Sequence, residues 1–433
     1  MKIKKVTVLG ANGTMGSNAS AIFASFGNAT VYMVARNKEK ALQAVARVVK
    51  AVKCESIKRN LIPSDYSSLE ECIENSDLVF ESVSEDFEIK KDVLRKVSLY
   101  LKPGAICCTG TSGLSITELA KELREEQRGA FFGMHMFNPP YVMVLCEMIK
   151  TEYSNERVFE KVKEYAKTTL RRQVVDVKDK PGFLGNRIGF QFINQAIQYA
   201  EMYKEAGGID YIDSILGKCT GRTMAPIMTA DFVGLDVHKA IVDYLYMNTH
   251  DFANKTFQLP NYVEGLIQQG RLGKKVDEGF YKTIIGPGGS RIKYVYDIQT
   301  SEYRPVNSYD FQFTKKMRQC IVESNYRKAY DILINSEDFE PRLCVKFLLT
   351  YVLYAITAGI EACDIPEAID HVMVTGFGWC PPYGIVEALG GKSVFEELIK
   401  ERIDPEMKGV IDWKMILDRV DKSSYDFRRY IKA

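Results

Sequence analysis

The first third of the chain alternates between short runs of β-branched residues and longer stretches with an apolar residue every three to four positions. The short runs predict strands at residues 6–9, 30–34, 78–81, 105–109 and 131–134, with a last one near 142–149. The longer stretches predict helices, the clearest at residues 38–52 and 87–101. Strands that alternate with helices predict an α/β Rossmann-like doubly wound sheet, in which ligands bind at the carboxyl ends of the strands.

Strand signals become rare after residue 150, and helical periodicity dominates the remainder. A breaker cluster at residues 284–290 indicates a junction, and helical patterning resumes at residue 311. Two segments also share a spacing, since Asp213 and Asp370 are each followed by a glycine eight residues later. We therefore predict a Rossmann-like domain at 1–180 and an all-α domain at 181–285, duplicated at 311–433.

Composition excludes several classes of partner. Lys and Arg total 58 and Asp and Glu total 56, so the chain has no field strong enough to gather nucleic acid. The ten cysteines include no Cys-x-x-Cys pair, and the four histidines lack zinc-ligand spacing, so we expect reduced thiols and no metal. No signal-peptide core and no run of about 18 apolar residues is evident, so we expect a cytoplasmic protein outside the membrane.

The first predicted strand leads into a glycine-rich turn and then an apolar helix. Three glycines at spacing Gly-x-x-Gly-x-x-Gly fall where backbone must approach a pyrophosphate at a helix N-terminus. The alternative is a merely tight turn, because a glycine triplet alone is weak evidence. The spacing is one residue longer than the usual dinucleotide fingerprint. We expect cofactor contacts from Gly10, Asn12, Gly13, Thr14, Met15 and Gly16.

The second predicted strand ends without the acid that an NAD site uses for the ribose 2′-hydroxyl. Arg36 stands there instead and offers a planar fork that suits a 2′-phosphate. This favours NADP. The alternative is that Arg36 is a solvated residue at a helix entrance and that the cofactor is NAD.

His135 lies at the end of a predicted strand, and Glu147 follows twelve residues later. An alcohol loses hydride readily only if its proton also leaves, and imidazole titrates near neutrality. A carboxylate behind the ring would fix its tautomer and stabilise the imidazolium. Taken alone, the histidine could equally be a satisfied core residue.

Several further segments together resemble the L-3-hydroxyacyl-CoA dehydrogenase family, which oxidises 3-hydroxyacyl-CoA thioesters. The resemblance covers residues 1 to about 282 and rests on order and spacing as well as on identity. The segments that carry it are residues 13–16, 81–90, 111–116, 133–139, 182–187, 233–236, 270–275 and 278–281.

The resemblance implies roles for individual residues. His135 would be the general base in oxidation and the acid in reduction, and Glu147 would orient it. Ser112 would hydrogen-bond the reacting 3-oxygen. Asn186 would reach in from the helical domain and hold the substrate near its thioester carbonyl and 3-oxygen, so that both domains build the site. Glu85 and Lys90 match positions near the nicotinamide and ribose, although a helix-capping acid and a solvated lysine are the alternatives.

The chain also departs from the family pattern. Gly110 stands where the family has Asn, and with Arg36 this indicates altered cofactor handling and a role as a reductase. Residues 311–395 resemble a second copy of the helical domain, as in multifunctional β-oxidation α-subunits. We expect an acyl-CoA substrate and a monomer or homodimer.

Two other hypotheses remain open at this point. One is a non-catalytic protein that binds acyl-CoA or NADP(H), and the other is a dehydrogenase of a 3-hydroxy acid without CoA. Turnover of thioesters and of free acids separates these possibilities.

Overall fold

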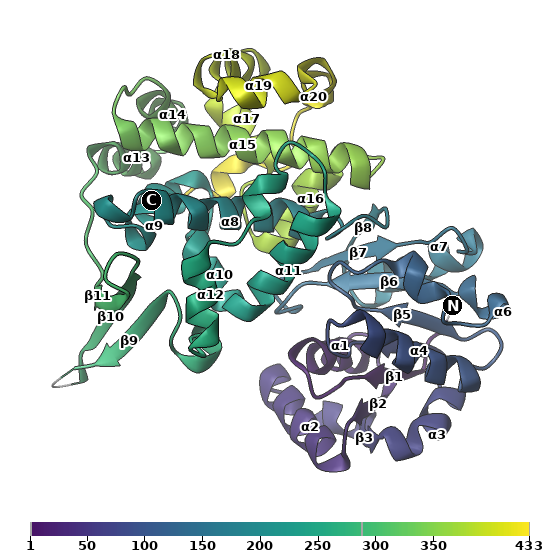
Figure 1. Ribbon diagram of the computed structural model, residues 1–433. Coiled ribbons are helices and arrows are strands. Elements are labelled where there is room, and N and C mark those ends of the chain that lie inside the picture. The colour runs from purple at the N-terminus through teal and green to yellow at the C-terminus, as the bar shows by residue number, and fades with distance from the viewer. Residues whose placement is uncertain (1, 287–288, 433) are drawn as a thin grey trace. The chain divides into compact units, whose positions relative to one another are not determined.

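The computed structural model describes residues 2–286 and 289–432, which form two compact units (Figure 1). The first unit is Met1–Phe183 and the second is Leu184–Ala433.

The first unit is built on an eight-stranded sheet of order β3-β2-β1-β4-β5-β6-β7-β8. Its strands are β1 (Lys5–Leu9), β2 (Thr30–Ala35), β3 (Leu61–Asp65), β4 (Leu78–Glu81), β5 (Ile106–Thr109), β6 (Phe131–Met136), β7 (Leu145–Ile149) and β8 (Gln173–Val177). All neighbouring strands run parallel except β6 and β7. The strand order reverses direction at β1, so the predicted doubly wound fold is confirmed.

The hydrophobic pattern did not predict β3 and β8, and these two strands lie at the two edges of the sheet. β3 contains Pro63, which has no N–H for a sheet hydrogen bond and is tolerated at an edge. Both strands are also incompletely buried. An edge strand therefore lacks the continuous apolar run that reveals a central parallel strand.

Helices cover the sheet and share a hydrophobic core with it (Figure 1). They are α1 (Thr14–Ser25), α2 (Lys38–Val52), α3 (Leu69–Glu74), α4 (Phe87–Tyr100), α5 (Ile116–Ala120), α6 (Glu125–Arg128) and α7 (Glu156–Glu164). One cluster joins Phe23 of α1, Val45 of α2 and Phe159 of α7 to the central strands. Phe23 also meets Phe80 of β4 edge to face at 5.6 Å between ring centres, which fixes α1 over the sheet.

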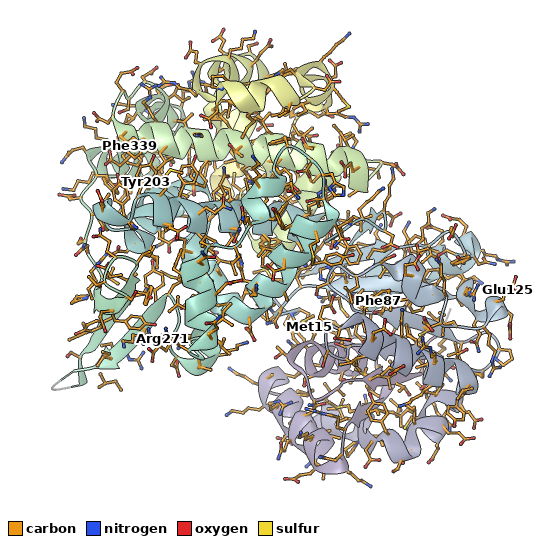
Figure 2. All side chains as sticks on the ribbon, viewed as in Figure 1. Met15, Phe87, Glu125, Tyr203, Arg271 and Phe339 are labelled. Atoms are coloured by element: carbon orange, nitrogen blue, oxygen red, sulfur yellow. The ribbon has the colours of Figure 1, made fainter. Side chains whose placement is uncertain are left out.

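The second unit is mainly helical. Its helices are α8 (Gly185–Met202), α9 (Ile209–Ile215), α10 (Pro226–Val233), α11 (Leu235–Asn248), α12 (Asn261–Gln268), α13 (Gln312–Val322), α14 (Tyr326–Ile334), α15 (Phe339–Ala362), α16 (Ala368–Phe377), α17 (Pro382–Leu389), α18 (Lys392–Arg402), α19 (Pro405–Val410) and α20 (Trp413–Arg419). α8 and α15 pack together, and Tyr203 meets Phe339 at 5.1 Å between ring centres (Figure 2).

By length and composition, α15 is the one helix in the described part of the chain that could cross a membrane. However, 83% of its most apolar 18-residue window is buried inside the unit. Helices α8, α14, α16, α17 and α18 all pack against it. Its apolar character is therefore accounted for by its place in a core.

The breaker cluster at 284–290 was predicted to be a junction between two helical domains, but it forms the turn of a β-hairpin. It connects β9 (Tyr281–Ile285) to β10 (Arg291–Asp297), and β11 (Glu302–Pro305) completes a three-stranded antiparallel sheet. Residues 287 and 288 of the cluster lie outside the described residues. The Gly286 N–H donates to the Ser290 carbonyl at 2.8 Å, which closes the turn.

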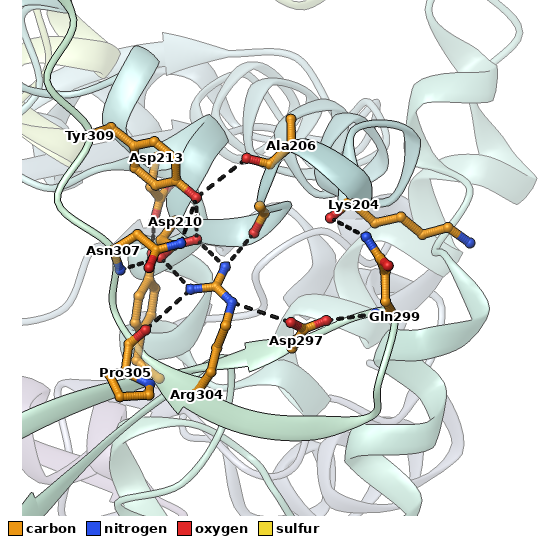
Figure 3. A network of polar contacts seen from close by, with 12 residues as sticks. Lys204, Ala206, Asp210, Asp213, Asp297, Gln299, Arg304, Pro305, Asn307 and Tyr309 are labelled. Atoms are coloured by element: carbon orange, nitrogen blue, oxygen red, sulfur yellow. Dashed lines mark hydrogen bonds and ion pairs between the residues drawn. The ribbon is translucent and has the colours of Figure 1, made fainter.

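An ion pair between a half-buried arginine and a buried aspartate attaches this small sheet to the helices (Figure 3). Arg304 of β11 donates to both carboxylate oxygens of Asp210 in α9, at 2.7 and 2.9 Å. Asp210 is 2% exposed and also accepts from the Asn307 N–H at 2.8 Å. A paired and hydrogen-bonded charge tolerates such burial, so the sheet is held in a defined place on α9.

The spacing shared by Asp213 and Asp370 has a structural counterpart. Asp213 accepts from the N–H groups of Ile227 and Met228 at the start of α10, and Asp370 accepts from that of Tyr383 at the start of α17. The glycine eight residues after each aspartate is left-handed, with φ of +81° at Gly221 and +65° at Gly378. The Cys380 N–H donates to the Gly221 carbonyl at 2.7 Å, so the two segments touch. The duplication of a whole domain stays a prediction.

Candidate active site

The turn between β1 and α1 depends on its first and third glycines. Gly10 has φ of +75°, and a Cβ there would lie 2.3 Å from the Ser82 carbonyl oxygen. A Cβ at Gly16 would lie 2.3 Å from the Gly10 carbonyl oxygen. The Gly13 N–H donates to that same oxygen at 2.9 Å. Only glycine fits at positions 10 and 16, which allows strand, turn and helix to pack closely.

Helix α1 begins with its first-turn N–H groups available to a ligand. Gly13 is the N-cap, no side chain caps the helix, and no acidic residue occupies the first turn. Gly13 and Thr14 are exposed, and Asn12 and Met15 are half-buried. Uncapped N–H groups and the helix dipole attract an anion, so these residues fit the pyrophosphate of a dinucleotide.

Arg36 follows β2 and is exposed. Among the described residues, no carboxylate lies within ion-pair distance of its guanidinium. Asn37, beside it, accepts from the Lys40 N–H at 2.9 Å and so caps α2. The exposed guanidinium of Arg36, at the end of β2, therefore could bind a 2′-phosphate.

The structure adds Asp65, which sequence reasoning missed. It ends β3 and is the register partner of Ala35 at the end of β2. Hydrogen bonds from Ser67 hold the pKa of its carboxyl below the ordinary 3.8, so it is ionised at neutral pH. Its charge would repel a 2′-phosphate, whereas its oxygens could accept from a ribose hydroxyl. Because β3 carries little hydrophobic signal, nothing in the sequence placed Asp65 next to β2.

His135 and Glu147 form a direct pair at the junction of β6 and β7. They are cross-strand partners in the antiparallel register of these strands. Glu147 Oε2 lies 2.7 Å from His135 Nδ1. His135 is 4% exposed and Glu147 is fully buried. The structure thus brings together two residues twelve positions apart, in the contact that the sequence predicted.

The surroundings of the imidazole are aromatic. The ring centres of Phe137 and Phe183 lie 4.6 and 5.6 Å from that of His135. A carboxylate accepts a hydrogen bond and does not donate one, so Nδ1 carries the proton and Nε2 is the acceptor of the neutral ring. The arrangement can take a proton at Nε2 and stabilise the resulting cation through Glu147.

Ser112 is half-buried, and its backbone is held by Glu85. The Ser112 N–H donates to Glu85 Oε1 at 2.7 Å, and the Thr111 hydroxyl donates to the same oxygen at 2.5 Å. Lys90 is 1% exposed and contacts Glu81 at 2.9 Å and Glu85 at 3.3 Å. Sequence reasoning missed Glu81, because the position of a carboxylate at the end of a buried strand does not reveal that it pairs with Lys90.

Gly110, where the resemblance implies an Asn, packs closely against Phe80 of β4. A Cβ at this position would lie 2.7 Å from Cζ of Phe80. The Phe80 ring therefore occupies the space that a larger side chain at position 110 would need.

Asn186 lies in the second unit, in the first turn of α8, and is 5% exposed. The next residue, Arg187, pairs with Asp251 at 2.6 Å and with Glu361 at 2.7 Å, which fixes this end of the helix. Ser112, His135 and Glu147 all belong to the first unit. The predicted meeting of Asn186 with these three residues stays a prediction.

Comparison with known proteins gives a consistent result. The family model described as 3-hydroxyacyl-CoA dehydrogenase, NAD binding domain, matches residues 5–180. The model described as 3-hydroxyacyl-CoA dehydrogenase, C-terminal domain, matches residues 182–283. The mitochondrial hydroxyacyl-coenzyme A dehydrogenase of Rattus norvegicus is 31% identical over 294 residues, which cover 65% of this chain and 91% of the rat protein.

A longer relative and a solved structure extend the likeness beyond residue 283. The probable 3-hydroxyacyl-CoA dehydrogenase of Bacillus subtilis is 28% identical over 371 residues, which are 84% of this chain. The chain spans only 45% of that relative's length. The crystal structure of 3-hydroxybutyryl-CoA dehydrogenase from Escherichia coli K12 covers 97% of this chain and 98% of its own, with a TM-score of 0.71 and 21% identity. At this identity the likeness shows the fold.

Proposed function

Because the chain belongs to the 3-hydroxyacyl-CoA dehydrogenase family, we propose that it interconverts L-3-hydroxyacyl-CoA and 3-oxoacyl-CoA thioesters by hydride transfer with a nicotinamide dinucleotide. The observation that carries this proposal is the buried pair of His135 and Glu147, 2.7 Å apart and directly opposite each other on adjoining strands. When bound, the nicotinamide ring supplies the carbon that accepts or gives up the hydride.

In the oxidation direction, His135 Nε2 takes the proton of the 3-hydroxyl group. Glu147 holds the ring by Nδ1 and stabilises the imidazolium that forms. In the reduction direction, the same nitrogen returns the proton to the 3-oxygen. The Ser112 hydroxyl hydrogen-bonds that oxygen and stabilises the negative charge that develops on it. Asn186 holds the thioester end of the substrate.

The cofactor would be held by this chain's backbone at the glycine turn. The N–H groups at Thr14 and Met15, in the uncapped first turn of α1, would hold its pyrophosphate, and Arg36 would hold the 2′ position of its ribose. The exposure of Arg36 and its freedom from carboxylates within the described residues support NADP. Asp65, which ends the adjoining strand beside Ala35, supports NAD. The choice between NADP and NAD therefore depends on the balance between the positive charge of Arg36 and the negative charge of Asp65.

The test is a substrate and cofactor assay with the full chain. Acetoacetyl-CoA and free acetoacetate are each offered with NADH and with NADPH, and the absorbance of the reduced cofactor is followed. We expect oxidation of reduced cofactor with acetoacetyl-CoA and more than tenfold slower oxidation with free acetoacetate, because the binding energy of the CoA portion is lost. Equal rates would indicate a dehydrogenase of free acids, and no oxidation with either substrate would overturn the proposal.

A further inference from the structure

A chain of polar contacts, buried at Glu81 and Lys90 and exposed at Glu85, runs behind Ser112 from the end of β4 to the loop after β5. It consists of Glu81, Lys90 and Glu85, all in the first unit. Glu81 is the last residue of β4, Lys90 lies in α4, and Glu85 lies in the loop between these two elements. The proposed catalytic roles of His135 and Glu147 do not use any of the three.

Glu81 is the rigidly held end of this chain of contacts. It is fully buried, and its Oε1 accepts from the Val83 N–H at 2.6 Å and from Lys90 Nζ at 2.9 Å. Its Oε2 accepts from the Thr109 hydroxyl at 2.6 Å and from Lys90 Nζ at 3.1 Å. Thr109 ends the adjoining strand β5, so Glu81 ties two strand ends to one ammonium group. Four charge-assisted or buried hydrogen bonds leave the carboxylate little freedom to move.

Glu85 is the end of this chain of contacts that binds the loop carrying Ser112. Its Oε1 accepts from the Ser112 N–H and the Thr111 hydroxyl, and its Oε2 faces Lys90 Nζ at 3.3 Å. The Thr111 hydroxyl oxygen in turn accepts from the Leu114 N–H at 3.3 Å. The loop that carries Ser112 is therefore attached to Glu85 at two consecutive residues.

Lys90 joins the two carboxylates and has no hydrogen left for another partner. An ammonium group has three N–H donors. The Lys90 ammonium faces both oxygens of Glu81, the Val83 carbonyl oxygen at 3.4 Å and Glu85 Oε2. Burial by itself lowers the pKa of Lys90, but the two carboxylates outweigh it and raise the pKa above 10.5, so the side chain is charged.

We propose that Glu81, Lys90 and Glu85 are positioning residues that fix the backbone of Ser112, and that Lys90 serves this chain of contacts and does not bind the cofactor. The proposal rests on the proposed function, because it assumes that the Ser112 hydroxyl contacts the reacting oxygen. A hydroxyl that stabilises a developing charge must be placed within a fraction of an ångström, and its backbone sets that placement. The pyrophosphate turn lies between β1 and α1, and its Gly10 packs against the backbone of Ser82 in the loop after β4, whereas Lys90 Nζ points to the carboxylates.

The variants are chosen so that no buried charge is left alone. Lys90→Met by itself would strand the Glu81 carboxylate, which risks unfolding. The double variant Glu81→Gln with Lys90→Met removes both charges and keeps the volumes. Glu85→Ala removes the acceptor for Ser112, whereas Glu85→Gln keeps an oxygen for it. Lys91→Met, at the next position of α4, is the control, because Lys91 pairs with the exposed Glu88.

Three readouts are compared after thermal melting has shown that each variant is folded. They are kcat with acetoacetyl-CoA, the dissociation constant of NADH or NADPH from fluorescence titration, and amide hydrogen exchange of the segment around Ser112. We expect kcat to fall on the order of tenfold or more in Glu85→Ala and in the double variant. Glu85→Gln should retain most of it, and Lys91→Met all of it. Cofactor affinity should change less than about threefold, and exchange at Ser112 should accelerate in Glu85→Ala.

Two results would overturn the inference. A tenfold weaker cofactor affinity in the double variant, with wild-type kcat at saturating cofactor, would make Lys90 a cofactor ligand. Wild-type kcat and wild-type exchange in Glu85→Ala would show that Glu85 does not hold Ser112. If the wild type turns over no thioester, the proposed function fails, whereas hydrogen exchange still tests the positioning chain.

Discussion

The Asp213 carboxylate caps the start of α10 as the Asp370 carboxylate caps the start of α17. Each also accepts from a hydroxyl, Tyr281 at 2.8 Å for Asp213 and Ser423 at 2.6 Å for Asp370. Burial raises the pKa of both carboxyls from 3.8 to about 7, although these hydrogen bonds oppose it. The two equivalent caps are thus titratable groups inside the second unit.

The first prediction concerns stability against pH. A carboxyl with a higher pKa in the folded chain binds its proton more tightly there, so it stabilises the fold below pH 3.8 and loses this effect as the pH rises toward 7. Asn at position 213 does not titrate. Between pH 5 and pH 7, the wild type should lose about 2 kcal/mol more free energy of unfolding than Asp213→Asn. Urea unfolding at both pH values measures this, with Asp310→Asn as an exposed control. Equal losses in all three proteins would contradict the buried titration.

The second prediction concerns the glycine turn. Ala at position 16 would put a Cβ 2.3 Å from the Gly10 carbonyl oxygen, so the turn must open. We expect Gly16→Ala to weaken cofactor binding at least about tenfold and to lower the melting temperature.

Gly265 of α12 provides the matched control for this substitution. A Cβ there meets nothing within 4 Å. Gly265→Ala should stabilise the chain by about 0.5–1 kcal/mol and leave cofactor affinity unchanged. Undiminished affinity in Gly16→Ala would show that the cofactor does not need the closed turn.

The third prediction concerns cofactor choice. Arg36→Asp should lower the ratio of NADPH to NADH activity by about ten- to a hundredfold, because a charge-assisted pair is replaced by repulsion. Asp65→Asn should shift the ratio in the opposite direction, since it removes a carboxylate beside the same strand end. The ratio of kcat/KM for the two cofactors measures both effects. An unchanged ratio in Arg36→Asp would remove Arg36 from the 2′-phosphate site.

The fourth prediction concerns Glu147. Glu147→Gln keeps an oxygen that can accept from His135 Nδ1 but removes the charge that stabilises the imidazolium. We expect kcat to fall about tenfold to a hundredfold, less than on loss of the imidazole itself. Cofactor affinity, measured in the same preparation, should stay within about threefold of the wild type. A wild-type kcat in this variant would leave Glu147 without a catalytic role.

Much of the first unit could be predicted from the sequence, because its central strands are buried on both faces and read as continuous apolar runs. The contact of His135 with Glu147 was also predicted, although the antiparallel pairing of β6 and β7 could not be foreseen from the hydrophobic pattern. Edge strands β3 and β8 were missed for the opposite reason, since half-buried strands carry weaker hydrophobic signals. With β3 missed, Asp65 could not be placed beside β2.

Other parts depend on contacts between residues far apart in the chain. The two carboxylates that pair with Lys90 come from β4 and the loop that follows it. A motif that contains the lysine does not reveal that both carboxylates contact its ammonium group. The breaker cluster at 284–290 signals a turn in either a linker or a hairpin. Strand pairing with β10 decides between the two, and pairing is a property of the fold.

The most direct test of the central claim is the kcat of His135→Gln at saturating cofactor and acetoacetyl-CoA. If His135 carries the proton, kcat should fall on the order of 10²–10⁴-fold while the dissociation constant of NADH or NADPH stays within about threefold of the wild type. His371→Gln, in the second unit, should keep the wild-type kcat. A His135→Gln variant that retains more than about half of the wild-type kcat would contradict the acid–base role on which the proposed function depends.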